Sequence, residues 1–561
     1  MRIEISISEV CLCKKTHLFL NIYCCKIVLL LINARIANLR YDMKFKLLFS
    51  LIIVLFFIIS SEKLFPQAGY SPGIDSVINL CTNPVLSKLI REFSGDTATV
   101  IGGLPYTLLS RHSSSVHNPK AAQFIYERFL SYGLQPVYMN YSANGSNVYV
   151  KKTGTKYPNR QYIICAHYDD MPSGPIAPGA DDNASGSCAV MEAARLLANQ
   201  NFEFTLIFVL FDEEEQGLIG SKNFADSAYF RGDSIIGVIN LDMISWDGNN
   251  DYQINIRSNT PSLPMAYTAI NIFYIYQPVL VPFIVMNVTS SDHASFWTRG
   301  YKAICGIQQR SEVNQYYHTV NDKFQIISMP YYLSYTRSAI AALMTFGNDY
   351  LADIFHSPIT VSQSNIPVNT SAVIRSPHKI AKNINGPRLY YKVNNGPLNY
   401  TGYNYNNLDT FKFTIPGQSA GSSVKYYIAA QDTLGRFVVT KPSGGRGINP
   451  PGTTEPDSMM NYTVITGIAS VNEALVYSLE QNYPNPFNPV TSINYQLAAN
   501  SHVSLKIFDI TGREVAALIN RKQNAGFYKV EWDASKFSSG VYFYKLITDN
   551  YINTKKMMLI K

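Results

Sequence analysis

The sequence predicts an α/β domain followed by two β-sandwich modules. From about residue 80 to 355, apolar runs of strand length alternate with segments of helical period, which favours a mostly parallel or mixed sheet with helices packed on it. After about residue 356, short alternating runs are separated by Asn, Gly, Pro and Ser, as is typical of β-sandwiches. The 561 residues are too many for one ordinary domain, so we expect three.

The α/β region contains three apolar runs that predict buried strands, over residues 161–167, 205–211 and 237–243. Three segments of helical period predict helices over residues 118–133, 183–200 and 329–347. Asn183 or Ser185 is the expected cap of the second helix. The following β-module is expected to end at about residue 465, and a last β-unit covers residues 475–561.

The N-terminal region predicts export. Residues 43–66 contain a short basic stretch, an apolar run over 47–60 and a polar end, which is the order of a secretory signal peptide. A membrane anchor is the alternative, although the apolar run is shorter than the roughly 20 residues of a spanning helix. Residues 1–42 fit neither role, and we interpret them as a non-native upstream extension, with Met43 as the true start.

The charge and the cysteines exclude several classes of protein. The net charge is +8, but the first 66 residues hold nine Lys or Arg against four Asp or Glu, so the remainder is near +3. No basic cluster indicates a nucleic-acid partner. Four of the eight cysteines precede residue 43, and the other four are scattered without a C-x-x-C pair. The sequence therefore predicts no disulfide framework and no thiolate metal site, although one disulfide is possible.

Four consecutive carboxylates, Asp212 to Glu215, directly follow the predicted strand over residues 205–211. Like charges at the end of a buried strand repel one another unless a cation lies beside them. Other acidic and imidazole side chains follow the remaining strands or lie farther along the chain: His167, Asp169, Asp170, Asp181, Asp182, Asp242 and His318. In an open α/β sheet, ligands gather at the carboxyl ends of the strands. Nitrogen and carboxylate donors without thiolate suit zinc, and their number favours two ions.

Taken singly, His167 could be a core histidine and the acidic run a solvated helix start. Taken together, the motifs resemble the co-catalytic two-metal zinc aminopeptidases, relatives of glutamate carboxypeptidase II and glutaminyl cyclase. The resemblance covers residues 80–355 and implies a three-layer fold of the zinc exopeptidase type, with helices on both faces of the sheet. Six motifs occur in order: H-x-D at His167, GADDNASG at 179–186, EEQGLIGS at 214–221, LDM at 241–243, SDHASF at 291–296 and YHTVND at 317–322.

The resemblance also implies a role for each residue. His167 and Asp242 would bind one zinc ion, Glu215 and His318 the other, and Asp182 both. Glu214 would be the general base. Asp169, two residues after His167, could accept the second ring N–H of that histidine and fix its tautomer. The SDHASF segment is expected to be pocket wall or scaffold, and Tyr317 could either bind substrate or pack.

The C-terminal segment resembles the sorting domain of the type IX secretion system. The matching residues are NYPNPFNP, D-x-x-G-R-E-V and SSGVYFY within 475–561. The resemblance implies transport by the Sec route, then export through the outer membrane by the type IX machinery, with the enzyme released or attached to the cell surface. The middle module, residues 356–465, loosely resembles immunoglobulin-like or fibronectin type III domains.

These observations predict a secreted dizinc exopeptidase, most simply an aminopeptidase acting on peptides, with its zinc peptidase domain over residues 67–355. Three alternatives remain open. The first is a glutaminyl cyclase-like acyltransferase with one zinc ion, and the second is a carboxypeptidase. The third is a surface adhesin whose peptidase domain is inactive.

Overall fold

The computed structural model describes residues 67–143, 145–309, 314–466, 477–482, 485, 487–524, 526–549 and 551–559. The expected upstream extension (1–42) and signal peptide (43–66) lie outside the described residues. No helix within the described ranges is long and apolar enough to cross a membrane. The chain forms two compact units, one ending at Val464 and one beginning at Ile465.

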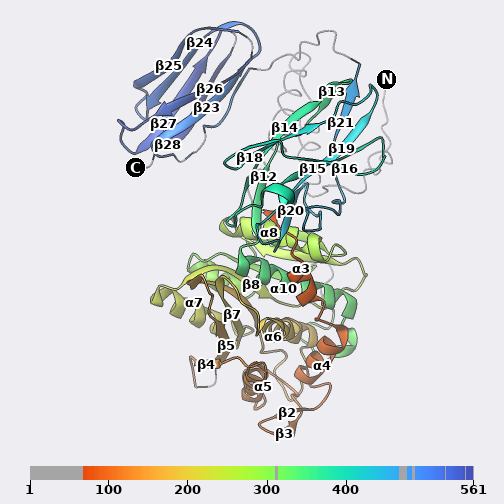
Figure 1. Cartoon of the computed structure of the whole chain (residues 1–561). Coiled ribbons are helices and arrows are strands. Elements are labelled where there is room, and N and C mark those ends of the chain that lie inside the picture. Colours follow the sequence, from red (N-terminus) through yellow and green to blue (C-terminus); the bar gives the residue numbers. More distant parts are fainter. Residues whose placement is uncertain are drawn as a thin grey trace, which may run out of the picture. The chain divides into compact units, whose positions relative to one another are not determined.

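A mixed sheet of eight strands forms the centre of the α/β region (Figure 1). In spatial order its strands are β10 (Val281–Met286), β9 (Gln253–Ser258), β11 (Ala303–Gln308), β8 (Ser234–Leu241), β6 (Tyr157–His167), β7 (Phe204–Phe211), β5 (Ser146–Lys152) and β4 (Pro136–Asn140). The four strands β11, β8, β6 and β7 are parallel to one another. His167 lies opposite Phe211 and Cys165 opposite Asn240, so the carboxyl ends of β6, β7 and β8 meet at one edge.

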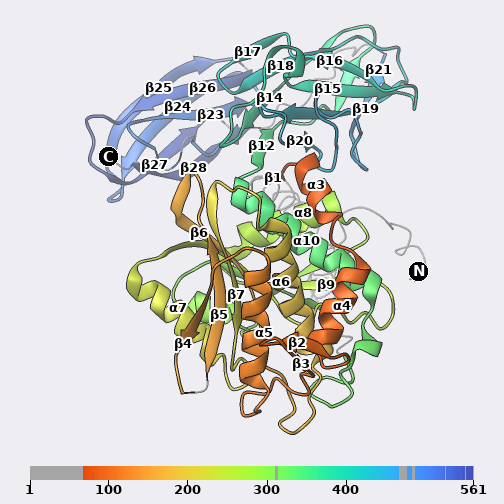
Figure 2. The ribbon, with the colours of Figure 1, turned by 60° about the horizontal axis from the view of Figure 1, so that its bottom comes forward.

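Helices cover both faces of this sheet, which confirms the expected three layers (Figure 2). Ile164 and Ala166 of β6 belong to one core, and Ile163 and Cys165 belong to another, because successive side chains of a strand point to opposite faces. The first core is covered by α3 (Pro72–Ile78), α4 (Asn83–Phe93), α5 (Asn118–Ser131), α6 (Gly186–Leu197), α8 (Leu263–Tyr276) and α10 (Met329–Asn348). The second is covered by α7 (Ile219–Arg231) and α9 (His293–Thr298). Every residue of β7 is buried, which explains its continuous apolar run.

The three predicted strands and three predicted helices are present, and one helix differs at its start. α6 begins at Gly186 rather than Asn183, because Asp182 and Asn183 have non-helical backbone angles. The side chain of Asn183 accepts the Gly186 N–H at 2.9 Å and so acts as the cap. Cys81, Cys165, Cys188 and Cys305 are all free and buried.

The middle module is a β-sandwich with a core that includes Phe411, Phe413, Tyr426 and Ile428. One sheet contains β1 (Gln67–Ala68), β12 (Leu351–Phe355), β14 (Val368–Arg375), β18 (Thr410–Ile415) and β17 (Tyr405–Asn407). The other contains β13 (Val361–Gln363), β21 (Met460–Ile465), β19 (Ser423–Gln431), β15 (Arg388–Val393) and β16 (Asn399–Gly402), and β20 (Val438–Lys441) pairs with β19. β1 and β12 fall within the expected peptidase range of 67–355, yet they pair into the sandwich. The α/β layers therefore end with α10.

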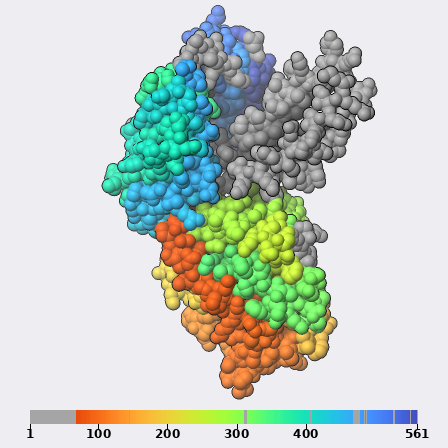
Figure 3. Space-filling view, turned by 90° about the vertical axis from the view of Figure 1, so that its right-hand side faces the viewer, coloured from red at the N-terminus to blue at the C-terminus, as the bar shows by residue number. Residues whose placement is uncertain are grey.

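The sandwich packs against the α/β region at the amino ends of the strands. Glu203, just before β7, lies 3.8 Å from His378 Nδ1 and 3.7 Å from Arg436 Nη1. Tyr350, just after α10, stacks on Phe437 with 5.2 Å between ring centroids. The N-terminal segment also contacts the sandwich, since Tyr70 forms a β-bridge with Val438. In Figure 3 the red surface at the start of the described chain adjoins the blue surface of the sandwich. The carboxyl edge of the sheet lies about 26 Å away, the length of the eight-residue β7 at about 3.3 Å per residue.

The second unit is also a β-sandwich, with a core that includes Leu505, Ile507, Trp532 and Tyr544. One sheet contains β22 (Ser478–Leu479), β23 (Val490–Leu497) and β26 (Gly526–Asp533). The other contains β25 (Glu514–Gln523), β24 (Ser501–Asp509), β27 (Gly540–Ile547) and β28 (Ile552–Leu559). Buried and partly exposed residues alternate along β23 and β24, as expected for strands with one face in a core.

Candidate metal centre

The structure brings all five predicted ligands together at the carboxyl edge of the sheet. His167 ends β6, Glu215 lies in the loop after β7, and Asp242 follows β8. Asp182 lies in the turn before α6, and His318 lies in the segment between β11 and α10. These side chains form two groups of three that share Asp182: His167, Asp182 and Asp242, and then Asp182, Glu215 and His318. Within each group the potential ligand atoms lie within 4.8 Å of one another.

The two carboxylate oxygens of Asp182 face different histidines. Oδ1 lies 3.4 Å from His167 Nε2, and Oδ2 lies 3.3 Å from His318 Nε2. His167 Nε2 is also 3.7 Å from Asp242 Oδ1, and His318 Nε2 is 3.0 Å from Glu215 Oε1. Zinc bonds of about 2.0–2.2 Å place neighbouring tetrahedral ligand atoms about 3.3–3.6 Å apart. The donor types and their spacing in each group therefore fit a zinc ion.

The centre has an excess of negative charge. Among the described residues, Asp182, Glu215 and Asp242 form ion pairs only with His167 and His318. Burial, together with the charge of Asp182, raises the pKa of Glu215 to about 7. Burial lowers the pKa of His318, but hydrogen bonds to Asp182 and Glu215 outweigh this effect and raise it to about 10. A bound cation would stabilise the ionised carboxylates.

Glu214 lies next to the ligand candidate Glu215 and near His167. Burial raises the pKa of its carboxyl group well above the usual range, and Asp292 and Asp242 add to the rise while His167 opposes it. A buried carboxyl group with a raised pKa is suited to accepting and returning a proton near neutral pH.

Asp169 holds the loop that carries Glu214 and Glu215. Its Oδ1 accepts the backbone N–H of Glu214 at 3.0 Å, and its Oδ2 accepts that of Glu215 at 3.1 Å. His167 Nδ1 lies 3.2 Å from the backbone oxygen of Asp169 and 3.5 Å from its Oδ1. The closer acceptor for the ring is therefore the Asp169 carbonyl, and the carboxylate mainly binds the neighbouring loop.

The remaining acids of the motifs bind the scaffold. Asp212 accepts hydrogen bonds from Asn118 Nδ2 at 2.9 Å and from the backbone N–H of Glu213 at 3.0 Å. Asp170 accepts the backbone N–H of Arg111 at 2.9 Å and lies 3.3 Å from its guanidinium group. The spacing of the acidic residues in the sequence could not show which of them bind metal and which bind the scaffold.

Two residues that the sequence left undecided lie close to the centre. Burial raises the pKa of Asp292 to about 7, and the charges of Asp169 and Asp242 contribute. The ring of Tyr317 stacks on that of His318 with 3.7 Å between centroids. Burial and then the nearby Asp182 and Glu215 raise the pKa of the Tyr317 hydroxyl. By contrast, His293 Nε2 lies 2.8 Å from the Val288 carbonyl, as expected for a scaffold residue.

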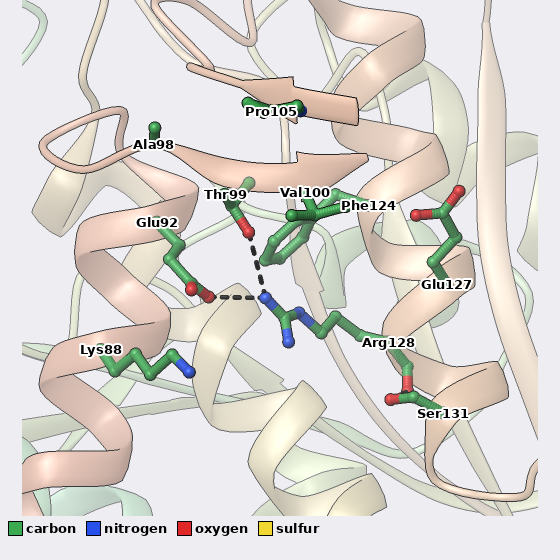
Figure 4. A pocket seen from close by; sticks show the side chains of 10 residues that line it. All are labelled: Lys88, Glu92, Ala98, Thr99, Val100, Pro105, Phe124, Glu127, Arg128 and Ser131. Carbon is green, nitrogen blue, oxygen red and sulfur yellow. Dashed lines mark hydrogen bonds and ion pairs between the residues drawn. The ribbon is translucent and has the colours of Figure 1, made fainter. Parts of the chain in front are cut away.

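A separate hollow of about 490 Å³ lies between α4, α5 and the hairpin formed by β2 (Thr99–Ile101) and β3 (Leu104–Tyr106) (Figure 4). Arg128 lies in this hollow and donates to Glu92 at 2.6 Å and to Thr99 Oγ1 at 3.2 Å. These contacts fix the hairpin to the two helices. The hollow contains none of the predicted site residues.

A mixed sheet whose carboxyl edge holds paired carboxylates and imidazoles is suited to binding metal ions. The comparison with protein families gives the particular family: residues 147–343 match peptidase family M28, and residues 481–561 match the secretion system C-terminal sorting domain. Residues 147–343 of the α/β region are thus similar to peptidase family M28, and residues 481–561 of the C-terminal unit are similar to sorting domains. A domain of the latter kind implies export.

The chain is also similar to individual proteins. A probable zinc metalloprotease of Pyrenophora teres f. teres is 35% identical over 138 residues, which cover 23% of this chain and 30% of the relative. Aminopeptidase YwaD of Bacillus subtilis is 29% identical over 192 residues, which cover 32% of this chain and 39% of the relative. The chain thus spans well under half the length of either relative. The LapA aminopeptidase structure from Legionella pneumophila aligns with a TM-score of 0.43 at 18% identity, covering 49% of this chain and 74% of that one.

Proposed function

We propose that the protein is a secreted exopeptidase with two zinc ions, and specifically an aminopeptidase that removes N-terminal residues from peptides. The observation that carries this proposal is the position of Asp182, which directs one oxygen toward each of two histidine-containing groups. In the proposal, His167 and Asp242 would hold one ion, Glu215 and His318 would hold the other, and Asp182 would be a ligand of both.

The pair of ions would polarise the scissile carbonyl group and acidify a water molecule. Glu214 accepts the proton of the attacking water and donates it to the leaving amine, which is the role of a general acid and base. Asp169 keeps Glu214 and Glu215 in place through their backbone N–H groups. The Tyr317 hydroxyl, which the charges of Asp182 and Glu215 influence, would be available to donate a hydrogen bond to the substrate.

The charge of the centre supports an aminopeptidase over a carboxypeptidase. Glu214, Glu215, Asp182, Asp242 and Asp292 supply five carboxyl groups to the centre. Among the described residues, no Lys or Arg forms an ion pair with any of them. An N-terminal ammonium group suits such a centre, whereas a C-terminal carboxylate would need a cation. The lack of a Lys or Arg partner for these carboxyl groups in the described part of the chain therefore favours peptides with a free amino terminus.

Two other candidates make different predictions. A glutaminyl cyclase-like acyltransferase would bind one zinc ion and cyclise an N-terminal glutamine without releasing an amino acid. An adhesin with an inactive peptidase domain would show no turnover. The presence of all five ligand candidates and Glu214 in one centre supports the peptidase.

We further propose export in two steps. Residues 43–66 would direct the chain through the inner membrane by the Sec route, and the C-terminal unit would direct it through the outer membrane by the type IX machinery. Removal of the C-terminal unit would then release the enzyme or leave it attached at the cell surface.

The test is hydrolysis of a panel of aminoacyl p-nitroanilides by the purified protein, with N-acetylated versions of the same compounds as matched controls. We expect turnover of the free-amine compounds only, abolished by a zinc chelator and restored by zinc. Equal turnover of the acetylated compounds would exclude an aminopeptidase. Turnover that is unaffected by chelation would exclude the zinc mechanism.

A further inference from the structure

Asp322 binds three consecutive backbone N–H groups of the turn that carries Asp182. Its Oδ1 accepts the N–H of Asp181 at 3.0 Å, and its Oδ2 accepts the N–H of Asp182 at 3.0 Å. Its own backbone carbonyl accepts the N–H of Ala180, also at 3.0 Å. The side chain is only 1% exposed, so water does not compete for these contacts.

The turn requires such an acceptor because it is not a regular helix. Asp182 has φ −108° and ψ 95°, which are not helical backbone angles. The backbone N–H groups around it therefore cannot all form the hydrogen bonds of an α-helix. Buried backbone N–H groups without a partner destabilise the folded chain. The Asp322 carboxylate satisfies two of them and thereby stabilises the backbone that orients the Asp182 side chain.

The same contacts connect three ligand segments. Asp322 follows His318 by four residues, so it joins the His318 segment to the Asp182 turn. Asn314 Nδ2 donates to Asp181 Oδ2 at 3.2 Å and to Asp322 Oδ1 at 3.3 Å. Asp181 Oδ1 in turn accepts the backbone N–H of Ser245 at 3.1 Å and its hydroxyl at 2.7 Å. Ser245 lies three residues after Asp242, which brings the third ligand segment into the network.

We propose that Asp322 is a positioning residue that sets the orientation of the bridging carboxylate of Asp182 and so couples the two zinc positions. The proposal rests on the proposed function, since it assigns Asp322 to the same centre. Asp169 makes the equivalent pair of contacts to Glu214 and Glu215. An aspartate thus follows each ligand histidine: Asp169 follows His167, and Asp322 follows His318. Each aspartate accepts two consecutive backbone N–H groups from a segment that contains a carboxylate ligand.

The test is zinc affinity of Asp322→Asn in the full chain, measured by competition with a chromophoric chelator. The amide is nearly isosteric, but its NH₂ group faces a backbone N–H, so the Asp182 turn must shift. We expect zinc affinity to fall by about 10- to 100-fold, the usual effect of losing a group that orients metal ligands. Activity should return with excess zinc, and KM should change little.

Asp432→Asn is the matched control. Asp432 is a buried aspartate of the middle sandwich that accepts the N–H of Arg436 at 2.6 Å and that of Phe437 at 3.4 Å. It therefore makes the same kind of contact far from the centre. We expect this control to lose thermal stability without any change in zinc affinity.

The outcomes separate the two proposals. A wild-type chain that binds no zinc would contradict the proposed function. A wild-type chain that binds zinc, with Asp322→Asn binding it equally well, would overturn the role of Asp322 alone. If Asp322→Asn does not fold, Asn314→Ala tests the same network with a smaller change, and unaltered zinc affinity in that variant would also overturn the proposal.

Discussion

Glu214 and Glu215 are adjacent in the chain but have different surroundings. Glu215 Oε1 lies 3.0 Å from His318 Nε2, whereas Glu214 forms no ion pair among the described residues. Both backbone N–H groups bind Asp169, so the two side chains are held in fixed and separate positions. One carboxylate can therefore bind metal while its neighbour transfers a proton.

This difference predicts that substitutions of the two glutamates have different effects on zinc content. We expect Glu214→Gln to lower kcat by about 10²- to 10⁴-fold, the usual contribution of general acid and base catalysis, with zinc content unchanged. We expect Glu215→Gln to lose zinc as well as activity. Elemental analysis and turnover of the same preparations distinguish the two effects, and near-normal activity of Glu214→Gln would remove it as the base.

The raised pKa values predict how the zinc-free protein responds to pH. Burial raises the pKa of Asp292 and Glu215 to about 7, above the usual values of 3.8 and 4.5. Between about pH 4 and pH 7 the folded state therefore binds more protons than the unfolded state, and the free energy of unfolding falls as pH rises. Chemical denaturation of the chelated protein should show this fall in the free energy of unfolding.

Zinc should stabilise the protein increasingly over the same pH range, because ionised ligands bind zinc better. A stability that rises with pH after chelation would contradict these shifts.

At the scale of elements, the centre depends on how closely α6 approaches β8. A Cβ atom on Gly186, the first residue of α6, would lie 2.5 Å from the Leu241 carbonyl oxygen. Leu241 ends β8 and precedes Asp242. A side chain at this position would therefore push the helix away from the strand that carries a ligand.

Gly186→Ala should consequently lower both stability and zinc affinity. We expect a loss of about 1–3 kcal/mol in the free energy of unfolding, as for other overpacked sites. Gly73→Ala in α3 is the matched control, because the nearest atom to its new Cβ is Ser71 Oγ at 3.6 Å. Denaturation and chelator competition should show no loss in the control, and wild-type behaviour of Gly186→Ala would contradict the close packing.

Strands and helices could be predicted from the sequence where neighbouring residues alone determine them. Continuous apolar runs identified β6, β7 and β8, and the six motifs placed the ligands at their carboxyl ends. The choice of Asp182 over Asp181 came from the family resemblance, because it depends on the backbone angles of one turn. The contact of Asp322 with that turn could not be predicted, since it joins residues 140 positions apart. The pairing of β1 with β12 was missed for the same reason, since it joins Gln67 to Ala352.

For the whole molecule, we expect the middle sandwich to stabilise the α/β region. It packs on Glu203, Tyr350 and Tyr70, at the end of the sheet opposite the metal ligands. Its sheet also includes β1 and β12, which flank the α/β region in the sequence. Folding of the peptidase region and of this sandwich should therefore be cooperative.

The C-terminal unit forms a separate compact unit with its own core. A chain that ends at residue 466 should therefore keep the kcat/KM and the melting temperature of the peptidase unit, while losing export. A second chain that ends at residue 355 leaves β12 without its partner β14 and uncovers Tyr350. It should melt at a clearly lower temperature. Equal stability of these two chains would contradict the cooperative unit.

The central claim is that five side chains from distant parts of the chain hold two zinc ions around Asp182. Its most direct test is the zinc content of the purified protein, measured by elemental analysis together with that of Asp182→Asn. We expect two zinc ions per wild-type chain and fewer in the variant, because Asp182 would be a ligand of both ions. A wild-type content of one or none, or a variant that retains both ions, would contradict it.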